Sequence, residues 1–481
     1  MSVIIHGVNY IPENEAKSSN IGIAITTHNR NETFNRAIQE QLKYLPAAAF
    51  IVVVDDGSKV PVTVPSGVNL IRVDVAEGIS RAKNRSIEAL YNAGCMEFFL
   101  FDDDCWPKVS GWEKPYIESP EPHLAHSWGL VALWRDPIHT AYHACGGTVL
   151  YYRREVIEKI GGMRDIFGRY GCEHVNLSDR IHNAGLTTWR YADITSAEEL
   201  FYECDRYEKQ SHKSTVSAAD LEHNKNTGTA LWRSMRDDAE YVEFRQQHDY
   251  VVTVLLTGVR DPQRNVNMKA DPALIQNLAK SVKIGKLVVL HDQLPEDVSM
   301  TTGAGEPVIF EKVPHCINPY FSRWQAAYQW LRANKQARNV WVVDGTDVEQ
   351  LQNPFNIENG TLYIGQEQAT LNSDWLVKNV ADSKISAFLK ENPHKTMLNP
   401  GTIGGERSIV QEFCHAMVHE WYDDHIDDVQ AWGRRRIGPF DMATVQYIAY
   451  RKFEGRIFYG PRVNTHFKGN KADEFAFWKH K

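Results

Sequence analysis

The sequence is poor in the features that mark membrane, secreted and nucleic-acid-binding proteins. None of its apolar runs approaches the ~20 residues that a membrane-spanning helix needs. Its first residues show no basic stretch followed by a long apolar core, as a secretory signal would. The net charge of −8 gives no overall attraction to nucleic acid. We therefore expect a protein without a membrane span.

The cysteines lack the spacing of a zinc or redox site. There are seven, and no two form a Cys-x-x-Cys pair. An odd number of scattered cysteines indicates free thiols in a reducing compartment, so we expect a cytoplasmic protein. With 481 residues, of which 43% are hydrophobic, the chain is long enough for two or three globular domains.

Strand-like apolar runs alternate with helical patterns in each half of the chain. The expected strands lie at 21–26, 50–54, 68–73 and 97–101, and again at 250–256, 286–290, 339–343 and 361–364. This alternation is typical of a mainly parallel sheet with helices on its faces. A polar stretch between the halves is rich in helix formers. The sequence predicts an α/β protein with domains at 1–216 and 249–481 and a helical connector at 217–248.

The most informative pattern is an acidic cluster at the end of an apolar run, once in each half. One run ends in Asp102, Asp103 and Asp104, and another ends in Asp344 and Asp347. In open α/β folds, ligands bind where the carboxyl ends of the strands meet. Neighbouring carboxylates are costly there without a cation, and they suit Mg²⁺ or Mn²⁺ together with phosphates. We expect Asp102, Asp104, Asp344 and Asp347 to bind metal.

Further polar side chains follow the strands and open a helix in the first half. They are Thr27, Arg30, Asp55, Asp56, Lys83 and Asn84. A carboxylate at a strand end can accept a hydrogen bond from a base or a ribose hydroxyl, and an arginine can bind a phosphate. Together with Asp103, these residues are our candidates for binding a nucleotide.

Five segments of the first half resemble the inverting glycosyltransferase family 2, which has the GT-A fold. They are Val-Val-Asp-Asp-Gly-Ser at 53–58, the helix start at 78–84, the acidic motif ahead of Pro107, Gly-Gly-Thr at 146–148 and Gly-x-Glu-x-x-x-Leu-Ser at 171–178. The match covers about residues 20 to 215. It departs from the family at Ala76, which replaces an Asn, at Lys83, which replaces an Arg, and at His174, which replaces an acid.

The resemblance implies a GT-A domain that uses a UDP-sugar. Asp56, alone or with Asp55, would hold the uracil, while Asp102 and Asp104 would manage the metal and the diphosphate. The departure at Lys83 keeps the positive charge.

The resemblance also places the general base at the start of the last motif. Glu173 is the first choice, because a carboxylate near the sugar can deprotonate an acceptor hydroxyl. His174 is the alternative, since its ordinary pKa lies near neutrality. His212 has two interpretations of equal weight: a further metal ligand of the kind that some GT-A enzymes use, or an ordinary surface histidine.

The second half resembles, more weakly, the glycogenin-like family 8 and its GT-A relatives. The matching segments are Asn-Pro-Gly at 399–401 and His-Phe-Lys-Gly-Asn-Lys at 466–471. The candidates here are the metal ligands Asp344, Asp347 and His466, the diphosphate-binding Lys468 and the catalytic Asp441. Lys471 fits the family pattern as well as Lys468 does. Two carboxylates with a histidine form a mixed site that suits Mn²⁺.

The sequence thus predicts a bifunctional, metal-dependent glycosyltransferase with two GT-A domains, of which the first is inverting. The acceptor is a glycan, a protein or modified DNA, and the acidic net charge counts against DNA. Two alternatives are a non-catalytic second domain that binds the acceptor, and a viral enzyme that modifies hydroxymethylated bases. A nucleotidyltransferase would need a Gly-rich loop after the first strand, where 26–29 has none. A carbohydrate-binding protein would not need two acidic clusters.

Overall fold

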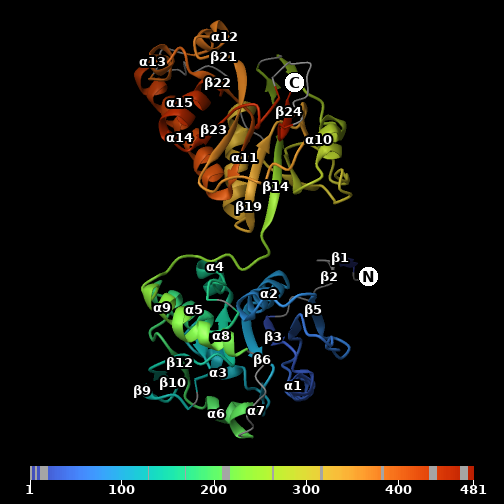
Figure 1. The fold of residues 1–481 in the computed structure, drawn as a ribbon, viewed down its shortest axis with the longest axis vertical. Coiled ribbons are helices and arrows are strands. Elements are labelled where there is room, and N and C mark those ends of the chain that lie inside the picture. The colour runs from blue at the N-terminus through green and yellow to red at the C-terminus, as the bar shows by residue number, and fades with distance from the viewer. Residues whose placement is uncertain are drawn as a thin grey trace. The chain divides into compact units, whose positions relative to one another are not determined.

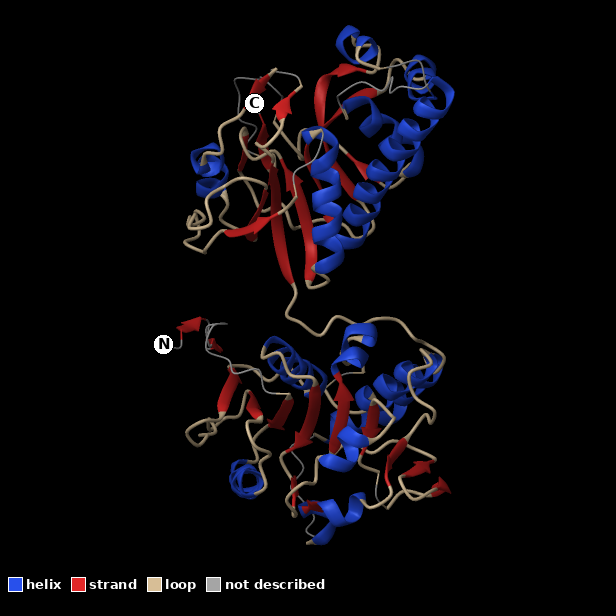
Figure 2. Ribbon diagram, turned by 180° about the vertical axis from the view of Figure 1, so that it is seen from behind, coloured by secondary structure: helices blue, strands red, loops and turns tan. Residues whose placement is uncertain are grey.

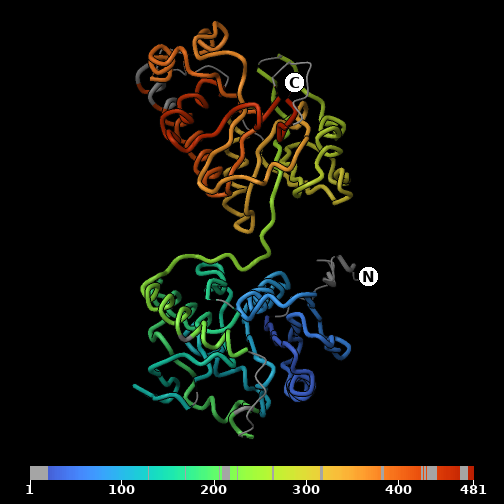
Figure 3. The backbone as a smooth tube through the Cα atoms, in the orientation of Figure 1, coloured from blue at the N-terminus to red at the C-terminus, as the bar shows by residue number. Residues whose placement is uncertain are grey.

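The chain folds into two compact units, Met1–Gln246 and Gln247–Lys481. The computed structural model describes residues 3–5, 8–10, 20–127, 129–167, 169–208, 217–262, 265–314, 318–380, 384–432, 441–465 and 475–480, with only the backbone of the first two segments. The units follow one another along the chain, blue to green and then yellow-green to red in Figure 3, without exchanging segments.

Unit 1 is built on a sheet of eight strands in the order β1-β2-β5-β4-β3-β6-β11-β8. These strands are β1 (Val3–Ile5), β2 (Val8–Tyr10), β3 (Ile21–Thr27), β4 (Phe50–Asp56), β5 (Asn69–Val73), β6 (Glu97–Asp102), β8 (His123–Ala125) and β11 (Val149–Arg153). The four central strands β5, β4, β3 and β6 are parallel. Strand β11 runs antiparallel to β6 and to β8, and β2 runs antiparallel to β1 and β5.

The remaining elements of unit 1 are helices and small sheets around this sheet (Figure 1). The helices are α1 (Asn31–Lys43), α2 (Ile79–Asn92), α3 (Lys114–Glu118), α4 (Arg154–Ile160), α5 (Glu173–Asn183), α6 (Ala197–Leu200), α7 (Cys204–Tyr207), α8 (Ala218–His223), a π-helical turn (Asn224–Gly228) and α9 (Thr229–Ser234). The small sheets pair β12 (Ala192–Ile194) and β9 (Ala132–Arg135) with β10 (His139–Tyr142), and β7 (Cys105–Pro107) with β13 (Phe201–Glu203).

Unit 2 has a seven-stranded sheet in the order β18-β17-β14-β19-β22-β21-β23. Its strands are β14 (His248–Leu255), β17 (Lys286–His291), β18 (Ile309–Lys312), β19 (Ala337–Val343), β21 (Leu362–Thr370), β22 (Thr396–Glu406) and β23 (Ile457–Phe458). Strands β18, β17, β14 and β19 are parallel, whereas β22 runs antiparallel to both β19 and β21.

Helices also cover the sheet of unit 2 (Figure 2). They are a 3₁₀ turn (Pro272–Ile275), α10 (Gln276–Ser281), α11 (Pro319–Ala333), α12 (Asp374–Lys378), α13 (Lys384–Glu391), α14 (Arg407–Trp432) and α15 (Met442–Lys452). Two small sheets pair β15 (Arg260–Asp261) with β16 (Val266–Asn267), and β20 (Val348–Gln350) with β24 (Trp478–His480).

The inner strands β3, β4 and β6 of unit 1 and β17 and β19 of unit 2 are apolar and buried over most of their length, because both faces of the sheet are covered there. Successive side chains of a strand point to opposite faces. Ile23 and Ile25 therefore pack with Phe34 of α1, while Ala24 packs with Ile87 of α2 on the other face. A hydrophobic core thus forms on each side of the sheet and fixes the strand register.

The same alternation builds unit 2. Val252 packs with Trp324 of α11, while Val251 packs with Leu278 of α10 on the other face. Helix α11 begins after Asn318, whose side chain caps the helix by accepting from the N–H of Tyr320.

The two sheets have the same core topology although the sequences show no close repeat. The order β5-β4-β3-β6-β11 in unit 1 corresponds to β18-β17-β14-β19-β22 in unit 2, with four parallel strands followed by one antiparallel strand. In both units a short strand follows the acidic motif and pairs antiparallel with the last strand of the unit that the structure describes, giving β7·β13 and β20·β24. The predicted α/β class is confirmed: each sheet holds four adjacent parallel strands, flanked by antiparallel strands on both sides in unit 1 and on the β22 side in unit 2.

The segment predicted as a helical connector packs on unit 1. Its helices end at Ser234, and the first strand of unit 2 begins at His248. The indole of Trp232 donates to Asp179 at 2.7 Å, and Asp238 pairs with Arg164. Residues 217–246 are therefore counted with unit 1.

The cysteines that the structure describes are free thiols, as expected from their spacing. They are Cys95, Cys105, Cys145, Cys172, Cys204 and Cys414. Within the described ranges, no helix combines the length and apolar character needed to cross a membrane.

Candidate active sites

A cavity of about 700 Å³ opens at the carboxyl ends of β3 and β6 in unit 1. The chain runs from β3 outward through β4 to β5 and then returns to the other side of β3 as β6. Open α/β sheets bind ligands where the strand order reverses in this way. Among its lining residues are many of those that the sequence singles out, namely Thr27, Arg30, Asp56, Lys83, Asp102, Asp103, Glu173 and His174.

Asp102 is the last residue of β6 and is paired with a buried lysine. Lys83, on α2, lies 2.7 Å from Asp102 and also donates to the carbonyl of Phe101 at 2.9 Å. The Lys83 side chain is 3% exposed, whereas that of Asp102 is 36% exposed. Burial raises the pKa of Asp102, and the positive charge of Lys83 opposes this rise. Lys83 thus neutralises the first acid of the motif from inside the protein.

Asp103 and Asp104 share an arginine. Nη1 of Arg30 lies 3.0 Å from Asp103 and 3.2 Å from Asp104, and the hydroxyl of Thr27 donates to Asp103 at 2.7 Å. Burial raises the pKa of Asp103 to about 7, against the opposing charge of Arg30. All three carboxylates of the motif therefore have a basic partner within the protein.

Glu173 and His174 form a hydrogen-bonded pair at the start of α5. Nδ1 of His174 lies 3.0 Å from one oxygen of Glu173. Burial would raise the pKa of Glu173, but the hydrogen bond and charge of His174 outweigh it, so the pKa is lowered. Burial likewise opposes the charge of His174, yet Glu173 raises its pKa. Among the described residues, the second oxygen of Glu173 is buried without a hydrogen-bond partner.

Positive backbone φ angles before α5 and a glycine beside the His174 ring accompany this pair. Cys172, just before α5, has a left-handed conformation with φ of 67°, and Gly171 before it has φ of 95°. Gly147 lies against the His174 ring, and a Cβ there would come within 3.1 Å of a ring carbon. The glycine thus leaves room for the imidazole beside the cavity.

Asp55 and Asn84 do not line this cavity; the structure places them in supporting contacts. Asp55 is fully buried and accepts from the N–H of Ser58 at 3.0 Å. Asn84 donates to the carbonyl of Met163 at 2.8 Å and accepts from the Met163 N–H at 2.7 Å.

Asp55 also accepts from the N–H of Val62 and pairs with Arg72, so it holds the turn after β4. Asp56 does line the cavity, and its carboxylate accepts from the N–H groups of Glu77 and Gly78 at 2.8 and 2.9 Å.

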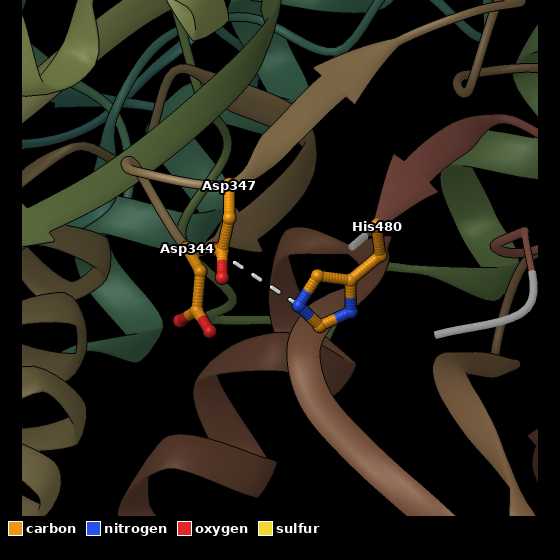
Figure 4. Close-up of side chains that lie close together, drawn as sticks. All are labelled: Asp344, Asp347 and His480. Carbon is orange, nitrogen blue, oxygen red and sulfur yellow. Dashed lines mark ion pairs between the residues drawn. The ribbon is translucent and has the colours of Figure 1, made fainter. Parts of the chain in front are cut away.

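Unit 2 has a cavity of about 740 Å³ in the equivalent place, at the carboxyl ends of β14 and β19. Asp344 and Asp347 follow β19, and His480 reaches them from β24 (Figure 4). One ligand atom from each residue lies within 4.8 Å of the other two. Nε2 of His480 is 4.0 Å from Asp347. Two carboxylates and an imidazole at these separations can hold a divalent cation such as Mn²⁺.

His480 is a functional candidate that sequence reasoning missed. Its position depends on the pairing of β24 with β20, in which His480 lies opposite Val348, the residue after Asp347. No local spacing in the sequence announces this contact. The histidine and lysine expected at this site, His466 and Lys468, lie outside the described residues, as does His212 of unit 1.

Gly401 is required by the geometry of this group. A Cβ at Gly401 would lie 2.8 Å from Nε2 of His480 and 2.9 Å from a carboxylate oxygen of Asp344. The carbonyl of Gly401 also accepts from the N–H of Asp344 at 2.9 Å. The glycine of the Asn-Pro-Gly segment, which the sequence placed on the acceptor side, thus lies against the candidate metal ligands.

Asp441 is an anchor for an arginine. Nη1 of Arg323 lies 2.6 Å from Asp344, while its Nε and Nη2 donate to one oxygen of Asp441 at 3.1 and 2.8 Å. The same oxygen accepts from the indole of Trp324 at 2.8 Å, and Asp441 is only 2% exposed. Burial lowers the pKa of Arg323, but Asp441 and Asp344 outweigh it and the pKa is raised. Asp441, predicted as catalytic, thus lines the cavity as a buried partner of Arg323.

The two sites share a basic residue on a helix that pairs with the first acid of the motif. Lys83 and Arg323 are each the fifth residue of the helix before the acidic strand, and each pairs with the first acid, Asp102 or Asp344. Each first acid donates its backbone N–H to a carbonyl at the antiparallel neighbour strand: Asp102 to Thr148, just before β11, and Asp344 to Gly401 of β22. Similar chemistry has thus been placed at the same point of the same topology.

Sequence comparisons add no family assignment. No model of a known protein family matches the chain, and a comparison with curated proteins found no match either. The family resemblances of the motifs remain predictions, and the functional interpretation depends on the two sites.

Proposed function

We propose that the chain is a metal-dependent glycosyltransferase with two donor sites, each transferring a sugar from a nucleotide sugar, taken as a UDP-sugar, to an acceptor hydroxyl. The observation that carries the proposal is the repeated arrangement of strand-end carboxylates and a buried basic residue beside a cavity at the reversal of strand order. If the acidic clusters served only the stability of each sheet, we would not expect them at equivalent positions of two sheets whose sequences differ.

In the first site the nucleotide diphosphate would lie against Arg30 and Lys83. Arg30 borders the cavity with a side chain that is 18% exposed, and a guanidinium can bind phosphate oxygens through two parallel hydrogen bonds. A divalent cation shared by the diphosphate and Asp102 or Asp104 would stabilise the leaving group as charge develops on it.

Glu173 would act as the general base of the first site. Its partner His174 keeps the carboxyl group ionised near neutral pH, and its second oxygen is available to accept a proton. An acceptor hydroxyl bound in the cavity would lose its proton to this oxygen as it attacks the sugar. Direct attack from the face opposite the leaving group inverts the anomeric centre.

In the second site Arg323 would take the place of Lys83. Asp441 and Trp324 hold the guanidinium at Asp344, so its position is fixed before a donor arrives. The cation would be held by Asp344, Asp347 and His480. This site would add a further sugar, to the product of the first site or to a separate acceptor.

The proposal is tested by measuring nucleotide release from a panel of UDP-sugars with Mn²⁺ and simple sugar acceptors. We expect Glu173→Gln to abolish turnover of one donor and Asp347→Asn to abolish turnover of another. Glu454→Gln is the matched control, because Glu454 is exposed and lies outside both cavities. If the intact chain releases nucleotide from none of the donors, the proposal is wrong.

A further inference from the structure

The two sites differ at one pair of positions, which Gly401 and His480 occupy in unit 2 and Thr148 and Glu203 occupy in unit 1. In unit 2 the imidazole of His480 lies directly against Gly401, where the Cβ of any larger residue would clash with the ring. In unit 1 the position of Gly401 belongs to Thr148, since both residues accept the N–H of the first acid. The position of His480 belongs to Glu203, which lies opposite Cys105, the residue after Asp104.

Glu203 does not join the acids of its own site. It accepts from the hydroxyl of Thr148 at 2.9 Å, and the same oxygen lies 3.3 Å from Nε2 of His126. Its other oxygen pairs with Arg206 at 3.2 Å. Both oxygens of Glu203 are thus engaged by neighbours other than Asp102, Asp103 and Asp104.

The acids of the first site are also neutralised from within. Lys83 holds Asp102, and Arg30 bridges Asp103 and Asp104 at 3.0 and 3.2 Å. A cation entering this site has to displace a basic side chain or share its carboxylate. Within the described ranges, the group of three metal-type ligands that converge closely is the one formed by Asp344, Asp347 and His480.

Charge around the second cavity points the same way. The described carboxylates that line it include Asp261, Asp344, Asp347, Glu367 and Asp441, and the described arginine among them, Arg323, is already bound to two of these. A cavity with this excess of negative charge repels a diphosphate until a divalent cation is present.

We propose that the two sites take divalent cations in different ways. The second site binds Mn²⁺ or Mg²⁺ by itself, through Asp344, Asp347 and His480, before any donor is present. The first site holds a cation only when a nucleotide diphosphate supplies further oxygen ligands and draws Arg30 away from the carboxylates. The statement on the first site rests on the proposed function, whereas the statement on the second does not.

The test is to titrate the full chain with Mn²⁺ alone and to follow free Mn²⁺ by electron paramagnetic resonance. We expect one strong site per chain. His480→Gln and Asp347→Asn, which change size little, should each weaken binding by about 100-fold or more, since even the loss of an outer-sphere partner costs 10–100-fold. Asp104→Asn should leave the binding unchanged. Circular dichroism and thermal melting confirm that each variant is folded.

The second part of the test adds UDP to the Asp347→Asn chain. This chain should bind no Mn²⁺ strongly on its own and should gain one strong Mn²⁺ site with UDP, which Asp104→Asn in the same background removes. Two sites of equal strength in the intact chain without nucleotide would overturn the inference. So would Mn²⁺ binding that Asp104→Asn abolishes and His480→Gln spares.

The outcome separates this inference from the proposed function. One strong Mn²⁺ site that depends on His480, in a chain that releases no nucleotide from any sugar donor, would support the second-site inference and refute the glycosyltransferase. Nucleotide release from sugar donors by a chain that binds no Mn²⁺ before the nucleotide arrives would do the reverse.

Discussion

Replacing Gly401 by alanine should damage the second site through a single methyl group. The added Cβ would lie 2.8 Å from Nε2 of His480 and 2.9 Å from Asp344, where ordinary contacts begin at 3.4 Å. The nearest ring atom, Cε1, would be only 2.4 Å away, so the imidazole must retreat by about 1 Å, more than the ~0.2 Å tolerance of a metal–ligand distance. Overpacking of this kind costs about 1–3 kcal/mol in the free energy of unfolding. We expect Gly401→Ala to shift the urea midpoint accordingly and to weaken Mn²⁺ binding by at least about tenfold.

A double-mutant cycle with His480→Ala checks the reasoning. Once the imidazole is absent, the methyl group loses its main obstacle, so Gly401→Ala should cost clearly less in the His480→Ala background. Urea unfolding, followed by tryptophan fluorescence, measures both free-energy differences. An equal cost in the two backgrounds, or Mn²⁺ binding by Gly401→Ala that matches the intact chain, would refute the proposed contact.

Three further changes have calculable effects. Burial lowers the pKa of His123 from 6.5 to about 4, so the unfolded chain takes up a proton at higher pH than the folded chain does. The free energy of unfolding should therefore fall as the pH drops from 6.5 to 4, by about 3 kcal/mol in all. His123→Gln should flatten this pH dependence in urea unfolding measured across the same range. Lys83→Met should lower the free energy of unfolding by about 2 kcal/mol, measured by thermal or urea unfolding. This is below the ~3–5 kcal/mol for breaking a fully buried ion pair, because water reaches Asp102. An equal loss for Lys83→Arg, which keeps the charge, would contradict the pairing. Asp441→Asn keeps the shape of the side chain but weakens its charge-assisted hydrogen bonds to Arg323, which contribute about 1.5–3 kcal/mol. Turnover at the second site should therefore fall by at least about tenfold, while nucleotide release at the first site stays unchanged.

The parts of the fold and sites that the sequence could predict are those set by local pattern. The apolar runs ahead of Asp102 and Asp344 identify buried strands, and parallel strands bring their carboxyl ends to one edge. The position of these acids at the two cavities follows from that rule alone. The α/β class follows in the same way from the alternation of periods along the chain.

The missed features depend on contacts between distant segments. His480 reaches Asp347 because β24 pairs with β20, and nothing near either residue in the sequence encodes that pairing. Arg323 is visible in the sequence as a basic residue, but its bond to Asp441 exists only once α11 and the start of α15 lie together.

Two residues predicted to contact the sugar donor, Asp55 and Asn84, make contacts within the fold. The sequence predicts Asp55 as a ligand contact because an acid at a strand end can bind a ligand, and the same carboxylate can bind the backbone of its own turn. The motif predicts a nucleotide contact for Asn84, whose amide is engaged by the backbone of Met163. A carboxylate or amide has the same hydrogen-bonding groups for either use, so only the three-dimensional neighbours decide between them.

The pairing of β24 with β20 has a consequence for how the protein is made. A ribosome synthesises Asp344 and Asp347 well before it reaches residues 478–480. The fully buried Trp478, on the same strand as His480, packs against Trp341 of the central sheet. Until residues 478–480 have left the ribosome, the nascent chain therefore lacks both a core side chain, Trp478, and a candidate metal ligand, His480. If the second site binds a cation as proposed, His480 can take part only after β24 has paired with β20.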